Sequence, residues 1–318
     1  IEGIAMARRI RSPLSIFGGK SMLAPKILSL FPEHERYCEP FLGGGAIFFS
    51  KKPCPYEVIN DVDEAIILFF RILCNRSEEL ISLCQLTEYN ECLFDECRAT
   101  WHDEPDELLR AWKWFVVSRQ SFSGYFGYQS HVVTTSRSGH AISVSTWISV
   151  VRQLPKFVGR LRNAKILCGD WWEAVQLADA PDCLHYMDPP YVPQTRKGRS
   201  KGNPGKKYRY ELTIEDHEQL VDRLLHEVQG HVVLSGYAHP VYKPLEDAGW
   251  HRVDWETSCN AAARTRGTGI LGEGAATRMQ KRIESVWLDP LTAEEVLPQA
   301  LFDSHDGDAT QPTGDSLQ

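Results

Sequence analysis

The sequence predicts an α/β fold, in which a mainly parallel sheet has helices on both faces and is interrupted by an inserted, mostly helical domain. The composition is that of a globular chain, because 42% of the 318 residues are hydrophobic and 24% are charged. Strand-like and helix-like apolar patterns alternate in two regions, 14–74 and 165–288. Such alternation is typical of a parallel sheet covered on both faces.

The first region is expected to contain two short strands and three helical segments. Apolar residues recur at helical spacing after the Gly18-Gly19 break, and Pro53 ends the helix that starts after three consecutive glycines. The elements expected here are a helix over 21–31, a strand over 36–39, a helix beginning at 46–50, a strand over 56–60 and a helix over 64–74.

The second region continues the alternation with five strands and three helices. Each strand pattern is a short apolar run, and the helix patterns between them are longer and amphipathic. The expected strands are 165–168, 183–187, 231–235, 250–256 and 283–288, and the expected helices are 171–178, 214–228 and 240–248.

The middle of the chain differs from both regions. It is helix-like to Arg119 and then rich in Ser, Thr, Gly and aromatic residues as far as Thr146. We therefore expect residues 6–75 and 165–288 to form one domain, with 76–164 inserted between its halves. Residues 289–318 are acidic and lack periodicity, so we expect a disordered tail.

Charge is distributed unevenly along the chain. The net charge of -7 argues at first against a nucleic-acid partner. However, residues 289–318 hold seven of the 42 acids and no Lys or Arg, so the remainder has 35 acids and 35 bases. The stretch 194–210 contains seven Lys and Arg residues and no acid, which indicates either a solvated loop or a contact with a polyanion.

Cysteine usage and hydropathy exclude several classes of protein. Nine cysteines without a C-x2-C pair favour free thiols in a reducing cytoplasm over disulfides, a structural zinc site or another bound metal. No run of 18 apolar residues occurs, so we expect no membrane-spanning helix. The first eleven residues lack the apolar core of a secretory signal.

The sharpest motif is Asp188-Pro189-Pro190-Tyr191, directly after an apolar strand pattern. By chance, about one chain in a thousand of this length would contain it. Ligands of open α/β sheets bind at the carboxyl ends of strands. Two prolines remove two N–H donors, so carbonyl oxygens and the Asp carboxylate form an acceptor edge that suits an amino group, and Tyr191 offers a ring for base stacking. A proline-rich turn with a half-buried tyrosine is the structural alternative.

A second motif, Glu39-Pro40-Phe41-Leu42-Gly43-Gly44-Gly45, lies between a strand and a helical pattern. Glycines at this place let the backbone approach a ligand closely. The sequence after them fits neither a phosphate-binding loop, which needs Gly-Lys-Ser/Thr, nor a G-x-G-x-x-G fingerprint, because Phe48 stands at the last position. A cationic or neutral nucleoside ligand fits better beside Glu39, and a plain tight turn is the alternative.

Three further charged residues lie next to expected elements. Lys20 stands at a helix start, where a second positive charge is unfavourable unless an anion such as an amino-acid carboxylate binds there. Asp61 follows a strand and could accept both hydroxyls of a ribose, and Asp170, beside Trp171, could accept from an adenine amino group. Taken singly, each Asp is better explained as a helix N-cap.

Together these groups describe a site for an adenosine that carries an amino-acid tail, which is S-adenosylmethionine. An amino group held by the Asp-Pro-Pro-Tyr edge would be the methyl acceptor. The cofactor-binding residues expected from the motifs are Phe17, Gly18, Gly19, Lys20, Glu39, Pro40, Phe41, Gly43, Gly45, Asp61, Asp170, Trp171 and Asp188, and the catalytic residues are Asp188, Pro189, Pro190 and Tyr191.

Over residues 15–290 the chain resembles the Dam-like DNA adenine-N6 methyltransferases of the alpha group. The resemblance rests on FGGK, EPFLGGG, Asn60-Asp61, Gly169-Asp170-Trp171 and DPPY in that family's order, with further matches at Tyr210, His217, Leu220, 233–237 and 282–287. It implies a Rossmann-like methyltransferase sheet, a catalytic domain over 6–75 and 165–288, and a target-recognition domain over 76–164. It also implies that Lys20, Asp61 and Asp188 bind the cofactor and that 188–191 hold the target adenine.

The resemblance implies double-stranded DNA as partner, and a cytoplasmic monomer with a cognate restriction endonuclease as a candidate partner. Residues 119–124 look like the family's Arg-x-x-Phe-Asn-Gly but differ from GATC-specific members, so no recognition sequence is assigned. The residues expected to contact DNA are Arg119, Gln120, Ser123, Tyr125, Gln129, Arg137, Arg196, Lys197, Arg199, Lys206, Lys207, Arg264 and Arg266.

Two other functions stay open at this point. A cytosine-N4 DNA methyltransferase would use the same acceptor edge, although Ser or Asn is commoner than Asp at its first position. A catalytically idle DNA-binding protein on the same scaffold is the second alternative, and the intact set of motifs from Lys20 to Tyr191 disfavours it.

Overall fold

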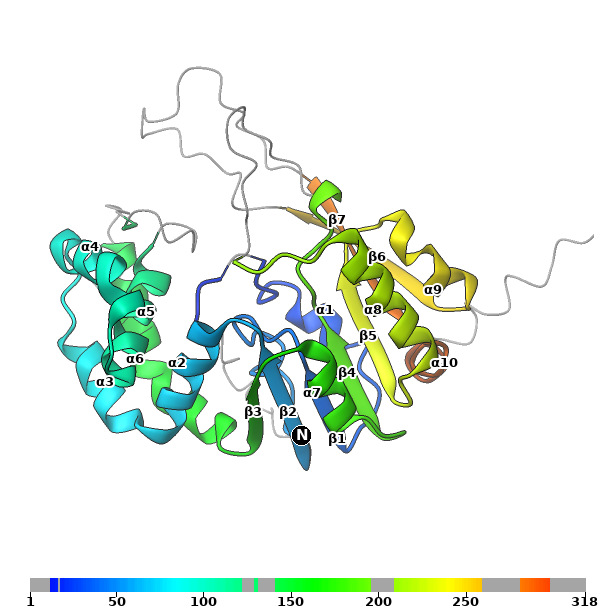
Figure 1. Ribbon diagram of the computed structural model, residues 1–318, viewed down its shortest axis with the longest axis horizontal. Coiled ribbons are helices and arrows are strands. Elements are labelled where there is room, and N and C mark those ends of the chain that lie inside the picture. The colour runs from blue at the N-terminus through cyan, green and yellow to red at the C-terminus, as the bar shows by residue number, and fades with distance from the viewer. Residues whose placement is uncertain are drawn as a thin grey trace, which may run out of the picture.

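The computed structural model describes residues 12–16, 18–121, 129–130, 141–195, 209–258 and 281–297. Its strands form one seven-stranded sheet in the order β3-β2-β1-β4-β5-β7-β6 (Figure 1). β1 to β5 pair in parallel, and β7 is antiparallel to both of its neighbours, β5 and β6, which confirms the predicted mainly parallel sheet. The strands are β1 (Arg36–Glu39), β2 (Tyr56–Asp61), β3 (Ala164–Cys168), β4 (Cys183–Met187), β5 (His231–Gly236), β6 (His251–Ser258) and β7 (Lys281–Leu288).

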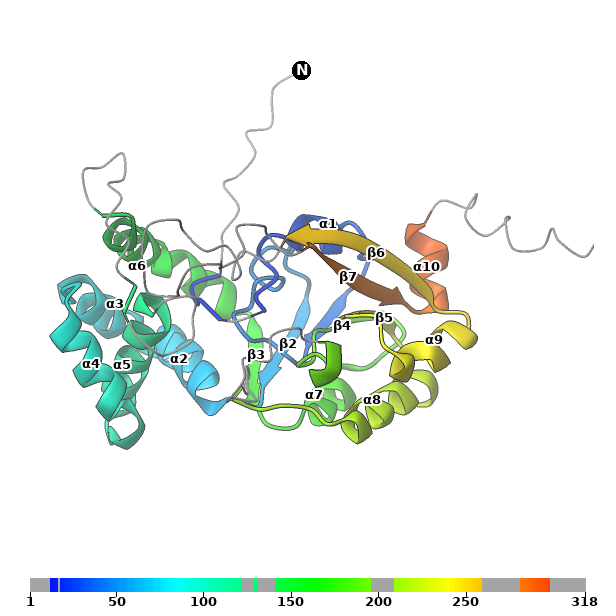
Figure 2. The ribbon, with the colours of Figure 1, turned by 90° about the horizontal axis from the view of Figure 1, so that it is seen from above.

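Helices cover both faces of the sheet, as expected. One face carries α7 (Trp171–Ala178), α8 (Ile214–His226) and α9 (Lys243–Asp247), and the opposite side carries α1 (Ala24–Leu28) and α10 (Pro290–Val296) (Figure 2). Each face has its own apolar core. Because successive strand residues point to opposite faces, Val58 packs into the core under α7 and α8, while its neighbour Ile59 packs into the other core.

The described residues between β2 and β3 form the α-helices α2 to α6, which lie beside the sheet (Figure 1). Three of them begin at a capping side chain, namely Asp63, Asn90 and Asp106. Aromatic rings join these helices to one another and to the sheet's core; the rings of Phe69 and Phe115 stack with centroids 4.6 Å apart. The helices are α2 (Glu64–Asn75), α3 (Ser77–Leu86), α4 (Glu91–Thr100), α5 (Glu107–Gln120) and α6 (Ile142–Leu161).

Four expected elements differ from the structure. The expected helix 240–248 is a 3-10 turn at Pro240–Tyr242 followed by the five-residue α9. Residues 46–50 form hydrogen-bonded turns and no α-helix, because Pro53 leaves too few residues to extend one. The expected helix 21–31 is limited to α1, which is five residues long and starts without a side-chain cap. The expected disordered tail begins instead with α10, whose N-cap Asp289 accepts from two backbone N–H groups; residues 298–318 lie outside the described residues.

Among the described residues, no helix has the length and apolar character that crossing a membrane requires.

Candidate active site

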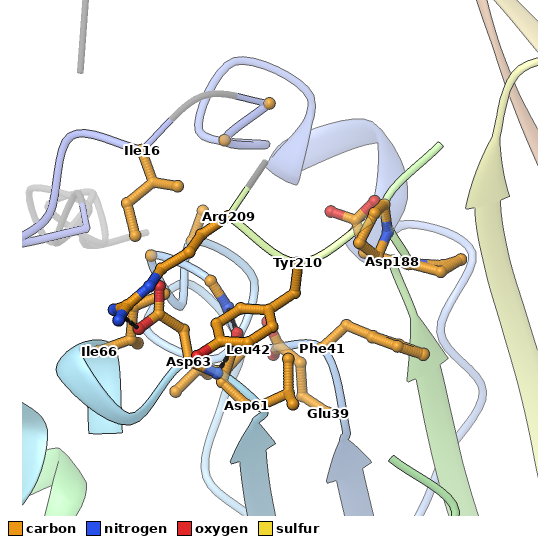
Figure 3. A pocket seen from close by; sticks show the side chains of 18 of the residues that line it. Ile16, Glu39, Phe41, Leu42, Asp61, Asp63, Ile66, Asp188, Arg209 and Tyr210 are labelled. Carbon is orange, nitrogen blue, oxygen red and sulfur yellow. Dashed lines mark hydrogen bonds and ion pairs between the residues drawn. The ribbon is translucent and has the colours of Figure 1, made fainter. Parts of the chain in front are cut away.

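Three carboxylates meet at one edge of the sheet. Glu39 ends β1, Asp61 ends β2 and Asp188 directly follows β4, and these three parallel strands are neighbours. All three side chains line a cavity of about 720 Å³, with the Tyr210 ring reaching into the space between them (Figure 3). The structure therefore brings together the motifs around residues 20, 39–45, 61 and 188–190, at the edge where open α/β sheets bind ligands.

The Lys20 side chain is buried and places a positive charge at the wall of this cavity. Its Nζ lies 2.8 Å from Oδ1 of Asp188 and 3.4 Å from Oε1 of Glu284. Burial raises the pKa of Asp188, and the Lys20 ammonium opposes that rise. Lys20 thus holds Asp188 towards its charged form while its own ammonium lies at the cavity wall.

The glycine turn binds Asp61 through its backbone. Gly43 and Gly45 have φ of 49° and 68°, a region that favours glycine. The Gly43 N–H donates to Oδ2 of Asp61 at 2.7 Å, and the Asp63 N–H donates to Oδ1 at 2.9 Å. Asp63, not Asp61, caps α2, so the capping alternative for Asp61 is wrong. Burial raises the pKa of Asp61 to about 6.

Glu39 is a buried acid beside the cavity. The Tyr37 hydroxyl donates to its Oε2 at 2.7 Å. Burial raises the pKa of Glu39 to about 8, and the charge of Asp188 adds to the rise. With a pKa of about 8, the Glu39 carboxyl is mostly uncharged at neutral pH and becomes charged as the pH rises above that value.

The sequence motif names Asn60 only because it precedes Asp61, whereas the structure shows that the Asn60 side chain links neighbouring strands. The side chain is buried, and its Nδ2 donates to the carbonyl oxygens of Pro40 and Gly169, at 3.0 Å each. It therefore ties the ends of β1, β2 and β3 together. An amide residue at the end of an otherwise apolar strand pattern is the sequence signal for this role.

Asp170 is not among the described residues that line the cavity. Its exposed side chain caps α7 by accepting from the Trp172 N–H at 2.8 Å, which confirms the capping alternative. The Trp171 ring stacks on Phe41, with centroids 5.8 Å apart, and Phe41 itself lines the cavity. An adenine contact by Asp170 stays a prediction.

Tyr191 lies behind the cavity. Pro189 and Pro190 line the wall, whereas the Tyr191 ring is 5% exposed and is not among the lining residues that the structure describes. Its hydroxyl donates to Glu284, and Nζ of Lys20 lies 4.6 Å from its ring centroid. In this structure the ring face expected to stack on a base is therefore covered in part by Lys20.

The outer part of the cavity includes residues outside the predicted cofactor, catalytic and DNA sets. Arg209 pairs with Asp63 (Nη1 to Oδ1, 3.1 Å), and its guanidinium lies 5.6 Å from the Trp101 ring centroid. Tyr210, adjacent to Arg209, also lines the cavity. The inserted helices thus contribute directly to the site, through contacts that no local pattern signals.

The predicted DNA contacts separate into three groups. Arg119 lines a second groove of about 600 Å³ together with hydroxyl groups of α6, and its buried Nε has no partner among the described residues. Gln120 and Gln129 are buried and bonded to each other at 2.6 Å, so neither can touch a base without a rearrangement. Phe17 of the cofactor set and Ser123, Tyr125, Arg137, Arg196, Lys197, Arg199, Lys206, Lys207, Arg264 and Arg266 of the DNA set lie outside the described residues.

Comparison with known proteins assigns the sequence to a family. A family model described as D12 class N6 adenine-specific DNA methyltransferase matches residues 17–259. The chain is 29% identical over 264 residues to the Type II methyltransferase M1.LlaDCHI of Lactococcus lactis subsp. cremoris, which covers 79% of this chain and 89% of that protein. It is 25% identical over 273 residues to a DNA N-6-adenine-methyltransferase of Escherichia phage P1, covering 82% of this chain and 35% of that protein.

Proposed function

The chain belongs to the D12 class N6 adenine-specific DNA methyltransferase family, and we propose from this premise that it methylates a specific duplex site by flipping the target adenine into the 720 Å³ cavity. An adenine amino group inside a duplex is out of reach of such a cavity, so the base must leave the stack at a cost of a few kcal/mol. The observation that carries the proposal is that Asp188 and Pro189 line the same cavity as the glycine turn.

The residues present fit S-adenosylmethionine. The glycine turn presents backbone without side chains. A Cβ added at Gly44 would lie 2.8 Å from Oγ of Ser12, and one added at Gly45 would lie 2.8 Å from the Phe49 ring, so both positions have room only for glycine. Asp61 retains lone pairs for ribose hydroxyls, and Lys20 offers an ammonium to a carboxylate. When bound, this cofactor supplies an electrophilic methyl group on a positively charged sulfur.

The target amino group is held by acceptors. Pro189 and Pro190 have no N–H to compete as donors, and Lys20 donates to Oδ1 of Asp188, so Oδ2 of Asp188 and the carbonyl oxygen of Pro189 can accept the two N6 hydrogens. Accepting both hydrogens pulls the nitrogen towards tetrahedral geometry and frees its lone pair for in-line attack. Orientation and electrostatics account for most of the gain, and the residues need no covalent intermediate.

DNA binding is assigned to the inserted domain and the basic stretch. We take residues 76–164 as the target-recognition domain, because its helices reach the cavity through Trp101 and Trp114. Phosphate contacts are assigned to the basic residues of 194–210, which end at Arg209 beside the cavity. Of these basic residues the structure describes Arg209, whose position in the cavity wall supports a phosphate contact close to the site.

The experiment is base-resolution mapping of modified DNA in a host that expresses the chain, with Asp188→Ala and Asp222→Ala as matched variants. Asp222 is an exposed acid on α8 outside the cavity. We expect N6-methyladenine at one short sequence for the wild type and Asp222→Ala, and a loss of orders of magnitude for Asp188→Ala. Modified cytosine instead would establish the cytosine-N4 alternative, and equal activity of Asp188→Ala would contradict the role of Asp188.

A further inference from the structure

Glu284 is a buried carboxylate that contacts the site from behind. It lies on β7, the antiparallel strand beside β5, and its side chain is 7% exposed. It is not part of the cavity wall formed by the described residues. Its Oε1 accepts a hydrogen bond from the Tyr191 hydroxyl and lies 3.4 Å from Nζ of Lys20. Both of these partners belong to the machinery described above.

The neighbouring residues of β7 show that Glu284 is exceptional for its position. Val286, Trp287 and Leu288 are fully buried apolar residues. A carboxylate at such a depth costs several kcal/mol unless a cation and hydrogen bonds compensate it. Among the described residues its compensation comes from Lys20 and Tyr191, which stand 264 and 93 residues away in sequence. The residues that offset the free-energy cost of burying Glu284 are therefore residues of the site.

Lys20 is shared between two acids. Its Nζ lies 2.8 Å from Asp188 and 3.4 Å from Glu284, so the two carboxylates hold the ammonium between them. The same ammonium lies over the Tyr191 ring, 4.6 Å from its centroid. Burial raises the pKa of Tyr191 well above its ordinary value, so the hydroxyl stays protonated and is the donor to Glu284. Glu284 thus contacts both Lys20, which pairs with Asp188, and Tyr191, which belongs to the same Asp-Pro-Pro-Tyr turn.

We propose that Glu284 is a positioning residue for methyl transfer, which holds Tyr191 and Lys20 so that the Asp188–Pro189 acceptor edge stays aimed into the cavity. The proposal rests on the proposed function, because it assigns a role within the same reaction. Glu284 itself touches neither the base nor the cofactor, and it acts through Tyr191 and Lys20. Without the Glu284 carboxylate, the Asp188 carboxylate and the Pro189 carbonyl are still present but are no longer held in one orientation.

The test compares Glu284→Gln, Tyr191→Phe and the double variant in single-turnover methyl transfer. Gln keeps an acceptor oxygen for Tyr191 but removes the charge that holds Lys20, and Phe keeps the ring but removes the hydroxyl. We expect each single variant to lower the rate by about tenfold or more, as for loss of a charge-assisted hydrogen bond. Because Gln carries no charge, it weakens the same charge-assisted hydrogen bond that Phe removes, so the double variant should lose less than the product of the two single losses.

The matched control is Glu246→Gln. This carboxylate also contacts β7, through the Nε1 of Trp287 at 3.1 Å, but it lies outside the cavity. We expect Glu246→Gln to keep the wild-type rate. Cofactor and duplex dissociation constants, measured by calorimetry and by fluorescence anisotropy, should change far less in Glu284→Gln than the rate does. A thermal unfolding midpoint for each variant shows that it is folded.

A wild-type rate in Glu284→Gln would overturn the proposal. So would rate losses that multiply in the double variant, because Glu284 and Tyr191 would then act independently. A loss confined to cofactor affinity would also overturn it. Failure of the wild type to methylate adenine is a separate outcome that contradicts the proposed function, whereas Glu284 is judged by the ratio of variant to wild type.

Discussion

The ammonium of Lys20 lies 2.8 Å from the carboxylate of Asp188, although 168 residues separate them in sequence. The pair joins the segment before α1 to the turn after β4 and places one cation at the cavity wall. A cation at this distance lowers the pKa of the acid, against the effect of burial. Removing the cation should therefore change how the site responds to pH.

Lys20→Met should weaken cofactor binding and shift the acid limb of the pH–rate profile to higher pH. Without Lys20, burial alone acts on Asp188, so its pKa rises and a smaller fraction is ionised at a given pH. The rate of methyl transfer measured from pH 5 to 9 tests this. The control is Lys26→Met on the exposed side of α1, for which we expect the wild-type profile. An acid limb that does not move would contradict the coupling.

Asp170→Ser should leave cofactor affinity within about twofold of the wild type, because changes at exposed sites have effects of about 0.5 kcal/mol. Serine is also a good N-cap, so α7 keeps its start. Titration calorimetry with the cofactor measures the affinity. A loss of tenfold or more would instead establish Asp170 as the adenine acceptor that the sequence predicted.

Glu39→Gln should flatten the dependence of stability on pH. The folded-state pKa of Glu39, about 8, is far above the ordinary value of 4.5, so between these values the folded chain holds a proton that the unfolded chain has released. The free energy of unfolding contributed by this group therefore falls as pH rises through that window. Urea unfolding at pH 5 and pH 8 should show a smaller decline for Glu39→Gln than for the wild type. The exposed Glu35→Gln serves as control, and equal declines in all three proteins would refute the prediction.

Arg160→Met should destabilise the chain by about 3 kcal/mol, as expected when a buried ion pair loses one partner. Arg160 at the end of α6 donates from Nη2 to Glu57 at 2.7 Å and to the Phe48 carbonyl at 3.2 Å. Lys51 remains as a partner of Glu57, which keeps the loss at the lower end of the usual range. Urea unfolding measures the change. Arg162→Met, at an exposed position, should stay within about 0.5 kcal/mol, and equal effects in both variants would be inconsistent with a buried pair.

Replacing Lys206 and Lys207 with Ala should reduce the slope of log affinity against log salt by about 1.8, or about 0.9 for each phosphate that is no longer neutralised. This prediction depends only on the run of like charges in the sequence. Duplex binding measured from 50 to 200 mM salt tests it, with Lys243→Ala on α9 as the control. An unchanged slope would exclude these two lysines from phosphate binding.

The sequence by itself determined the sheet and the identity of the site's main groups. Apolar runs placed the strands that precede Asp61 and Asp188 to within a residue or two, because strand burial is a local property of the side chains. The DPPY and triple-glycine motifs named the acceptor edge and the turn, since prolines and glycines fix backbone chemistry without reference to the rest of the chain.

Only the tertiary structure decided which of the two Asp residues caps a helix. Asp61 and Asp170 look alike in sequence, yet one binds the glycine turn and the other caps α7, because only Asp61 lies opposite a neighbouring strand's turn. The contacts of Glu284 with Tyr191 and of Arg209 with Asp63 follow from strand order and from helix placement. Such contacts join segments far apart in the chain, and no local periodicity carries that information.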